Sequence, residues 1–327
     1  MMNSAHKSGL SCFTPFRCIG PRRVPTPQPG RDQALVKVAG SSVNPCDVDY
    51  IEFGVGCNGG AGTLGMDLSG TVVSLPSATG ACGHLAVGDE VWADVGGVKG
   101  DTGAMAEYAV VNCGQTGLKP KSLNFTAAGT IPLVGFTSLE CLKETGAPWA
   151  ESANTTVVIT SGTGGTGFVA IQIAKALGAA RVITSTSGAA NIALAKRLGA
   201  DVVVDYKVED IFAALPDDSV DVVYDNYGSK GEADKAMRTM KKGGVYLVLP
   251  GGNGGTLSRH PKEGVRQINF GMAKATNHSL LDELAALFDA GQMQPHVFQS
   301  FPLADAAKAF ALSKTGTVVG KVAVTIY

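Results

Sequence analysis

A glycine-rich segment, SGTGGTG at residues 161–167, has the residue types and spacing that most clearly point to chemistry. Gly162, Gly164 and Gly167 form the pattern GxGxxG, directly after the apolar run TTVVIT and directly before FVAIQIAKALGA. The first glycine permits a tight turn, the second lets the backbone approach a pyrophosphate, and the third lets a helix pack closely on a strand. N–H groups at the start of the following helix would face the phosphates.

A lone GxGxxG in a chain with 43 glycines is more often a flexible turn than a binding site. Here the preceding strand and the following helix complete the context that the motif requires. We therefore predict a dinucleotide site. It is formed by Gly162, Thr163, Gly164, Gly165, Thr166 and Gly167.

The end of the next apolar strand bears on which dinucleotide binds. Dinucleotide-binding segments that prefer NAD have an Asp or Glu about 20 residues after the glycine motif, and its carboxylate holds the ribose 2′-hydroxyl. This chain has Thr184, Ser185, Thr186 and Ser187 there instead. Hydroxyl groups can donate to a 2′-phosphate without repelling it, so the segment favours NADPH, with NADH still possible. The alternative is that these residues are only the polar end of a strand.

The elements around the glycine loop alternate between strands and helices. After the strand at 155–160, apolar residues at 169, 173, 176 and 177 share one helical face. Strand and helix patterns then repeat as far as VYLVLP at 245–250, with a helix expected at DIFAALP, 210–216. Such alternation builds an α/β fold with a doubly wound parallel sheet.

The two ends of the chain have a different pattern. Strand signals at 34–43, 68–75, 89–95 and 104–111 lie between Gly, Pro and Asp residues, which predicts a β-rich body. Helical spacing begins at about residue 124. The tail from about 278 contains two amphipathic helices, 279–291 and 303–316, and a last strand at 321–326.

Composition narrows the class of protein. The 327 residues include 27 Lys plus Arg and 28 Asp plus Glu, a net charge of −1, so a nucleic-acid partner is not expected. No apolar stretch approaches the roughly 20 residues of a membrane span. The seven cysteines are odd in number and lack CxxC spacing, which favours reduced thiols and a cytoplasmic location. The basic, Ser-containing opening leaves organelle targeting open.

From about residue 20 to the end, the chain resembles the medium-chain dehydrogenase/reductase family, and within it the zinc-independent, quinone oxidoreductase-like branch. The order and spacing of many blocks carry the resemblance. They are VPTPQPG with ALVKV, VNPCD (43–47), LGMDLSG (64–70), VGDEVWA (87–93), AEYAVV (106–111), IPLVGFTS (131–138), SGTGGTG, LGADVVVDY (198–206), VDVVYDNYG (220–228) and GKVAV (320–324).

This resemblance implies a GroES-like β-rich catalytic domain at 1–124 and 278–327 and a Rossmann NADP-binding domain at 125–277. Zinc-using relatives have Cys and His ligands where this chain has Asn44 and Met66, and an amide with a thioether is a poor zinc set. We therefore expect no metal. In NADP-using relatives a Ser or Thr, a Lys and a Tyr hold the 2′-phosphate; Ser187 and Tyr206 match, whereas Asn191 stands in the Lys place. Thr137 and Asn226 match residues beside the cofactor.

The expected reaction is hydride transfer from NADPH to a quinone or another conjugated carbonyl compound. It needs a positioned nicotinamide and a hydrogen-bond donor for the developing oxyanion. Candidate catalytic residues are Asn44 and Tyr50 as donors, with Asp47 either taking part or capping the loop. Asn44-Pro45 is also an ordinary turn signal, and Tyr50 could be a packed aromatic residue.

Three functions stay open at this point. They are a quinone reductase, a double-bond reductase for α,β-unsaturated ketones and aldehydes, and a low-turnover NADPH-binding redox sensor or structural protein. A short-chain reductase is excluded because no tyrosine has a lysine four residues later. We expect a small-molecule substrate and a homodimer.

Overall fold

The computed structural model describes residues 2–7, 19–53, 62–76, 80–96, 103–249, 253–271 and 277–326. It divides into two compact units. Unit 1 comprises 1–134, 275–291 and 295–327, and unit 2 comprises 135–274 and 292–294. The first division lies after the expected boundary at 124 because α2 (Phe125–Ala128) contacts β3 (Gln33–Val43) and β4 (Asp67–Ser74) of unit 1.

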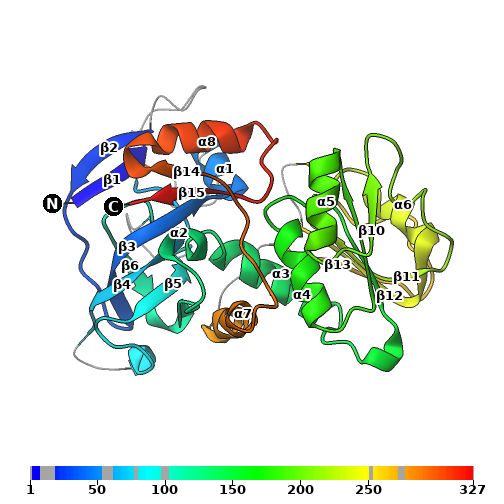
Figure 1. Ribbon diagram of the computed structural model, residues 1–327, viewed down its shortest axis with the longest axis horizontal. Coiled ribbons are helices and arrows are strands. Elements are labelled where there is room, and N and C mark those ends of the chain that lie inside the picture. Colours follow the sequence, from blue (N-terminus) through cyan, green and yellow to red (C-terminus); the bar gives the residue numbers. More distant parts are fainter. Residues whose placement is uncertain are drawn as a thin grey trace. The chain divides into compact units, whose positions relative to one another are not determined.

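Unit 2 contains a six-stranded parallel sheet (Figure 1). Its strands in spatial order are β10 (Val202–Asp205), β9 (Arg181–Thr186), β8 (Thr156–Ile159), β11 (Val220–Asp225), β12 (Met240–Val248) and β13 (Arg266–Asn269). In chain order this is 3-2-1-4-5-6, the order of doubly wound dinucleotide-binding sheets. The order reverses between β8 and β11, so a ligand is expected at the carboxyl ends of these two strands.

Helices cover both faces of this sheet. In Figure 1, α4 (Gly167–Ala176) and α5 (Ala189–Arg197) lie on one side and α6 (Glu232–Thr239) lies on the other. The helix α3 (Pro132–Glu144) leads into the unit, and η3 (Glu151–Ala153) precedes β8. Because the central strands are covered on both faces, Val157, Val158 and Ile159 are fully buried.

Two expected helical segments differ from the sequence interpretation. Residues 210–216 form successive turns, so the helix expected there was wrong. The Asp210 carboxylate accepts the N–H groups of Phe212 and Ala213, and Pro216 follows too soon for a helix to propagate. The helical pattern from 124 divides into α2 and α3, because Asn124 caps α2 and Pro132 begins a new helix.

Unit 1 is a β-rich body made from both ends of the chain. Its main sheet runs β14 (Val297–Pro302), β15 (Lys321–Thr325), β3, β4, β5 (Glu90–Asp94) and β7 (Thr116–Leu118), with β6 (Tyr108–Asn112) paired to β3. A smaller sheet pairs β1 (Met2–Lys7) with β2 (Ile19–Val24). The helices α1 (Pro45–Phe53), α7 (Ser279–Asp289), α8 (Ala306–Lys314) and η4 (Leu303–Asp305) belong to this unit. The expected fold class is confirmed.

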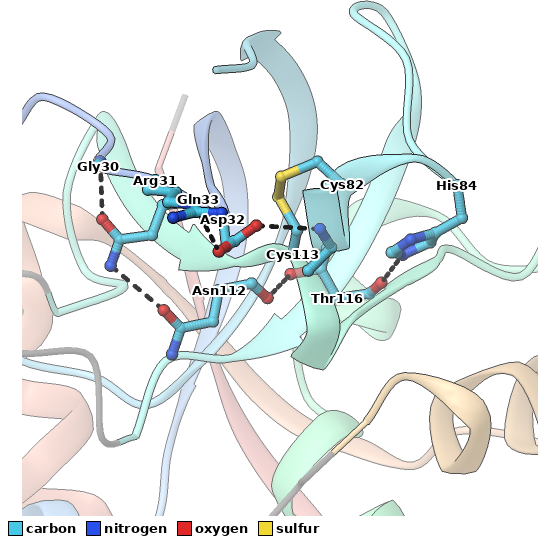
Figure 2. The surroundings of a disulfide bond; sticks show 10 residues. Gly30, Arg31, Asp32, Gln33, Cys82, His84, Asn112, Cys113 and Thr116 are labelled. Carbon is cyan, nitrogen blue, oxygen red and sulfur yellow. Dashed lines mark hydrogen bonds and ion pairs between the residues drawn. A yellow bond between two sulfur atoms is a disulfide. The ribbon is translucent and has the colours of Figure 1, made fainter. Parts of the chain in front are cut away.

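A disulfide joins Cys82 to Cys113 in unit 1 (Figure 2). These residues lie in two short 3-10 helices, η1 (Gly80–Cys82) and η2 (Cys113–Gln115), with Cα atoms 4.9 Å apart. Asp32 brings the helices together: its carboxylate accepts the Ala81 N–H at 3.0 Å, and its carbonyl accepts the Cys113 N–H at 3.0 Å. The expectation of reduced thiols was therefore wrong for this pair, whose contact depends on strand pairing rather than on sequence spacing.

Candidate active site and family

The loop from β8 to α4 is fixed by its own backbone. Ser161 has a φ of 50°, a left-handed conformation that turns the chain sharply. The Gly162 N–H then donates to the Ser185 carbonyl at 2.8 Å, and the Gly164 N–H donates to the Ser161 carbonyl at 3.0 Å. The left-handed turn thus falls on Ser161, one residue before the first glycine of the motif.

The three motif glycines differ in the space around them. A Cβ atom at Gly162 would overlap the Thr184 side chain, and one at Gly167 would overlap the Ser161 carbonyl. At Gly164 the nearest atom is Ser161 Oγ at 3.0 Å, which a side-chain rotation can move. Gly162 and Gly167 therefore serve the packing of strand and helix. Gly164 leaves backbone surface open, which fits the close approach of a pyrophosphate.

Polar side chains meet where β8 and β11 end. Thr166 precedes α4 without capping the helix; its hydroxyl donates to Asn226 Oδ1 at 3.1 Å, and Asn226 Nδ2 donates to the Thr160 carbonyl. The Thr160 hydroxyl donates to the fully buried Asp225 at 2.8 Å. From α3, the Ser138 hydroxyl donates to the Thr166 carbonyl at 3.2 Å. The structure therefore brings the glycine loop and Asn226 together at the place where the strand order reverses.

Most of the hydroxyl groups at the end of β9 hold the loop in place. Thr184 donates to the Ile159 carbonyl at 2.6 Å, Ser185 Oγ accepts the Ser161 N–H at 3.3 Å, and the Thr163 and Thr186 hydroxyls are 2.6 Å apart. These contacts support the interpretation as a polar strand end for three of the four residues. Ser187 alone of the four is partly exposed, so it is the one that a cofactor can reach.

Ser187 has an acidic neighbour from β10. Its hydroxyl donates to the Asp205 carboxylate, which also accepts the N–H groups of Lys207 at 3.0 Å and Gly188 at 3.4 Å. These bonds, the Ser187 bond first, lower the pKa of Asp205, so it is a carboxylate at neutral pH. The end of β9 has no acidic residue, but β10 supplies the Asp205 carboxylate next to Ser187.

The remaining cofactor candidates lie in unit 2. Asn191 donates to the Ser187 carbonyl at 2.9 Å, which holds the start of α5. Tyr206 follows β10 and is 60% exposed, so its ring is accessible to a ligand. Thr137 is buried in α3, one residue before Ser138. Gly165 lies within the loop between Gly164 and the start of α4.

In unit 1, Asn44 lies at the centre of a buried polar network that precedes α1. Its Nδ2 donates to Asp67 at 2.7 Å, and its Oδ1 accepts from Lys321. Asp67 also accepts the Ser42 hydroxyl and the Leu133 N–H, each at 2.7 Å, and Lys321 Nζ lies 3.5 Å from its carboxylate. Asn44, Asp67 and Lys321 are at most 3% exposed.

Asp47 and Asp94 add two buried carboxyl groups to this region. Asp47 accepts the Asn44 N–H at 2.9 Å and so caps the start of α1. Burial raises the pKa of Asp47 to about 7, and burial together with the Asp67 charge raises the pKa of Asp94 to about 8. Asp94 pairs across the sheet with Asp67. Near neutral pH, Asp94 therefore keeps its proton for most of the time.

The residues in the zinc-ligand places do not fit zinc. Both polar atoms of the Asn44 amide are hydrogen-bonded, and Met66 Sδ accepts the Cys46 thiol at 3.0 Å. Within the ranges that the structure describes, no group of three or more His, Cys, Asp or Glu residues is placed to hold a metal. An amide and a thioether offer zinc neither a thiolate nor an imidazole.

Sequence reasoning identified Asn44 and Asp47 but missed Asp67, Lys321 and Asp205. Each missed residue stands within a block quoted for the family resemblance, namely LGMDLSG, GKVAV and LGADVVVDY. A lysine or aspartate among apolar strand residues is the signal that could have revealed the first two. The side chain of Tyr50 lies outside the described residues.

Unit 2 has the strand order and open glycine loop of a dinucleotide-binding domain, and unit 1 is a β-rich body with a buried polar centre. These features are typical of a dinucleotide-binding enzyme. Residues 30–121 match the alcohol dehydrogenase GroES-like domain, and residues 198–324 match the zinc-binding dehydrogenase family. The chain belongs to the medium-chain dehydrogenase/reductase superfamily.

Similar proteins include two plant reductases. The chain is 31% identical to the 2-methylene-furan-3-one reductase of Solanum lycopersicum, covering 92% of this chain and 74% of that protein. It is 32% identical to the chloroplastic NADPH-dependent alkenal/one oxidoreductase of Arabidopsis thaliana, covering 91% and 73%. The structure is similar to the quinone oxidoreductase from Coxiella burnetii, with a TM-score of 0.83 and 26% identity over 100% of this chain and 99% of that one. These relatives support an oxidoreductase with a nicotinamide cofactor.

Proposed function

We propose that this protein transfers a hydride from NADPH to a quinone or to an α,β-unsaturated ketone or aldehyde, without zinc. The observation that carries the proposal is Asn44, which stands in a zinc-ligand place with its amide held between Lys321 and Asp67. Its Nδ2 donates to Asp67, and its side chain is also hydrogen-bonded to the Asp47 carboxyl group. The names of the plant relatives and of the Coxiella enzyme support the class of acceptor.

The chemistry divides between the two units. When bound, the nicotinamide supplies the hydride. In unit 2, the backbone around Gly164 and the uncapped start of α4 bind the pyrophosphate. In unit 1, the Nδ2 group of Asn44 is the donor that we assign to the carbonyl oxygen of the acceptor, where negative charge develops. The acceptor would take the place of the Asp47 carboxyl group as a partner of the Asn44 side chain. A conjugated acceptor is already electrophilic, so a polarised amide replaces a Lewis acid.

The proton that completes the reduction comes from the solvent or a side chain of unit 1. Tyr50 is the candidate that we carry forward from the sequence, because a phenol can both donate to the oxyanion and release a proton. Asp47 is assigned a positioning role, since its carboxyl group holds the Asn44 N–H at the start of α1. Tyr50→Phe should lower the rate of proton delivery and leave cofactor binding unchanged.

We propose NADPH as the preferred donor, with NADH also accepted. Ser187, Tyr206 and the name of the Arabidopsis relative support NADPH. Asn191 in the lysine place and the Asp205 carboxylate bonded to Ser187 weaken that preference. The expected result is therefore a modest ratio between the two cofactors. An equal or lower Michaelis constant for NADH would remove NADPH from the proposal.

A panel of acceptors tests the function. Simple quinones, alkenals and alkenones are compared with the matching saturated ketones and aldehydes, and NADPH oxidation is followed by absorbance. We expect turnover of the conjugated compounds only. Faster NADPH oxidation with quinones would indicate a quinone reductase, and faster oxidation with alkenals and alkenones would indicate a double-bond reductase. If NADPH binds but no acceptor is turned over, the alternative of a redox sensor or structural protein replaces the enzyme.

Assembly and location remain predictions from the sequence. In the described part of the chain, no helix is long and apolar enough to cross a membrane. The Arabidopsis relative is chloroplastic by name, and the Cys82–Cys113 disulfide removes the argument that all thiols are reduced. A cytoplasmic or organelle location is therefore proposed, and a homodimer is expected in sedimentation experiments.

A further inference from the structure

Lys321 places a buried positive charge beside Asn44. It begins β15, which pairs antiparallel with β3 so that Val322 lies opposite Val43. Its Nζ donates to the Val43 carbonyl at 3.2 Å and to Asn44 Oδ1, and lies 3.5 Å from the Asp67 carboxylate. A buried ammonium group is costly unless it is paired and hydrogen-bonded. Lys321 satisfies this requirement with three oxygen partners.

The partners of Asn44 determine which way its amide points. An ammonium group can only donate, so the Asn44 oxygen must face Lys321. A carboxylate can only accept, so the nitrogen must face Asp67. The reversed amide would set nitrogen against the ammonium group and oxygen against the carboxylate. Lys321 and Asp67 together therefore allow one orientation of the amide, whose side chain is also hydrogen-bonded to the Asp47 carboxyl group.

We propose that Lys321 is a positioning residue of the active site, which fixes the Asn44 amide and supplies the buried positive charge that a metal would otherwise provide. This inference rests on the proposed function of Asn44. By donating to Oδ1, the ammonium group draws electron density from the amide and makes the Nδ2 group a stronger donor. Lys321 thereby acts on the substrate carbonyl through Asn44.

A purely structural role makes a different prediction. Lys321 also joins β15 to β3 and neutralises Asp67, so its loss would lower stability in either case. If Lys321 acts by positioning Asn44, replacing Lys321 should no longer change kcat once Asn44 has been removed. A purely structural role makes no such requirement. This difference can be measured by a double-mutant cycle on kcat.

Lys119 offers a matched control in the same unit. Its side chain is 4% exposed, lies 3.2 Å from a carboxylate oxygen of Glu90, and donates to the carbonyls of Pro120 and Leu123. It resembles Lys321 in burial, charge and number of oxygen partners. None of these partners belongs to the network around Asn44. Lys119→Gln should therefore lower stability while kcat stays within about twofold of wild type.

The experiment compares Lys321→Gln, Asn44→Ala, the double variant and Lys119→Gln. Each is assayed with NADPH and the best conjugated acceptor, and its melting temperature and NADPH dissociation constant are measured. We expect Lys321→Gln to lower kcat at least about tenfold with unchanged NADPH affinity, and to cause no further loss in the Asn44→Ala background. Full kcat in Lys321→Gln, or losses that multiply in the double variant, would overturn the inference.

If Lys321→Gln does not fold, the same cycle is run with Lys321→Arg, which keeps the charge but moves the donor. A several-fold loss of kcat that depends on Asn44 supports the inference, and an Asn44-independent effect overturns it.

Two further outcomes separate this inference from the proposed function. If Asn44→Ala retains full kcat, the proposed donor fails and the inference fails with it. If Asn44→Ala is slow and Lys321→Gln is not, only the inference fails.

Discussion

The glycine loop of unit 2 and the polar centre of unit 1 are built in opposite ways. The loop is a continuous segment whose bonds run mainly to itself and to the adjacent end of β9. The polar centre joins Asn44, Asp67 and Lys321, which are separated by up to 277 positions along the chain. The first can be identified from local spacing alone. The second exists only after the C-terminal strand has entered the N-terminal sheet.

The largest expected effect tests the polar centre. Asn44→Ala removes the donor that we assign to the oxyanion, and loss of one such donor lowers kcat by about 10²–10³-fold in other enzymes. We expect this loss with little change in the NADPH dissociation constant. Because Asp67 and Lys321 would remain buried without their amide partner, the melting temperature should fall as well. An Asn44→Ala protein that is folded and fully active would show that the centre is only structural.

The next effect separates binding from packing within the glycine loop. Gly164→Ala should weaken NADPH binding about tenfold or more, equivalent to about 1.4 kcal/mol, while the melting temperature stays near that of wild type. Gly165→Ala should act on binding in the same direction. Gly167→Ala is the contrasting variant, because its Cβ would overlap the Ser161 carbonyl and destabilise the fold. Unchanged affinity in a folded Gly164→Ala protein would mean that the loop is not the nucleotide site.

Smaller changes in cofactor preference are expected around Ser187. Asp205→Asn removes a negative charge next to the proposed 2′-phosphate position but keeps an oxygen that can accept the Lys207 N–H. We expect up to about a fivefold gain in the preference for NADPH over NADH. Asn191→Lys should add to this by a charge-assisted contact. If neither variant changes the ratio of the two Michaelis constants, the 2′-position lies elsewhere.

The smallest effect concerns stability against pH. Asp94 has an ordinary pKa of 3.8 and a folded pKa of about 8, so the folded state holds its proton more tightly. The stability from this group is complete below about pH 4 and is lost as the pH rises through about 8. In Asp94→Asn the side chain is uncharged at every pH, like the protonated carboxyl group of Asp94. Its free energy of unfolding should therefore gain on that of wild type between pH 5 and 8, by at most about 1.4 kcal/mol per pH unit, and its melting temperature should rise relative to wild type over the same range.

Asp47→Asn sharpens this measurement, because its folded pKa is about 7. Its gain over wild type should level off about one pH unit earlier than that of Asp94→Asn. Thermal melts from pH 5 to 9 would show both profiles. A constant difference between each variant and wild type across this range would contradict the assignment of buried, protonated carboxyl groups.

Features built from neighbouring residues could be predicted from the sequence, whereas features built from distant residues could not. Hydrophobic periodicity predicted the parallel sheet, and GxGxxG predicted the loop, because both depend on neighbouring residues. The bonds of Lys321 to Asn44 and Asp67 depend on the pairing of β15 with β3. The contact between Cys82 and Cys113 depends on Asp32 in the same way. Asp205 was missed because the fingerprint places the acid on the second strand rather than the third.

Hydride delivery to a conjugated acceptor without metal is the central claim, and isotope transfer tests it most directly. Protein treated with a strong zinc chelator is given NADPH deuterated at C4 of the nicotinamide, once on each face, together with an alkenone. We expect full activity after chelation, and deuterium from one face of the nicotinamide at the β-carbon of the saturated ketone. Deuterium on the carbinol carbon of an alcohol, or activity that returns only when zinc is added, would contradict it.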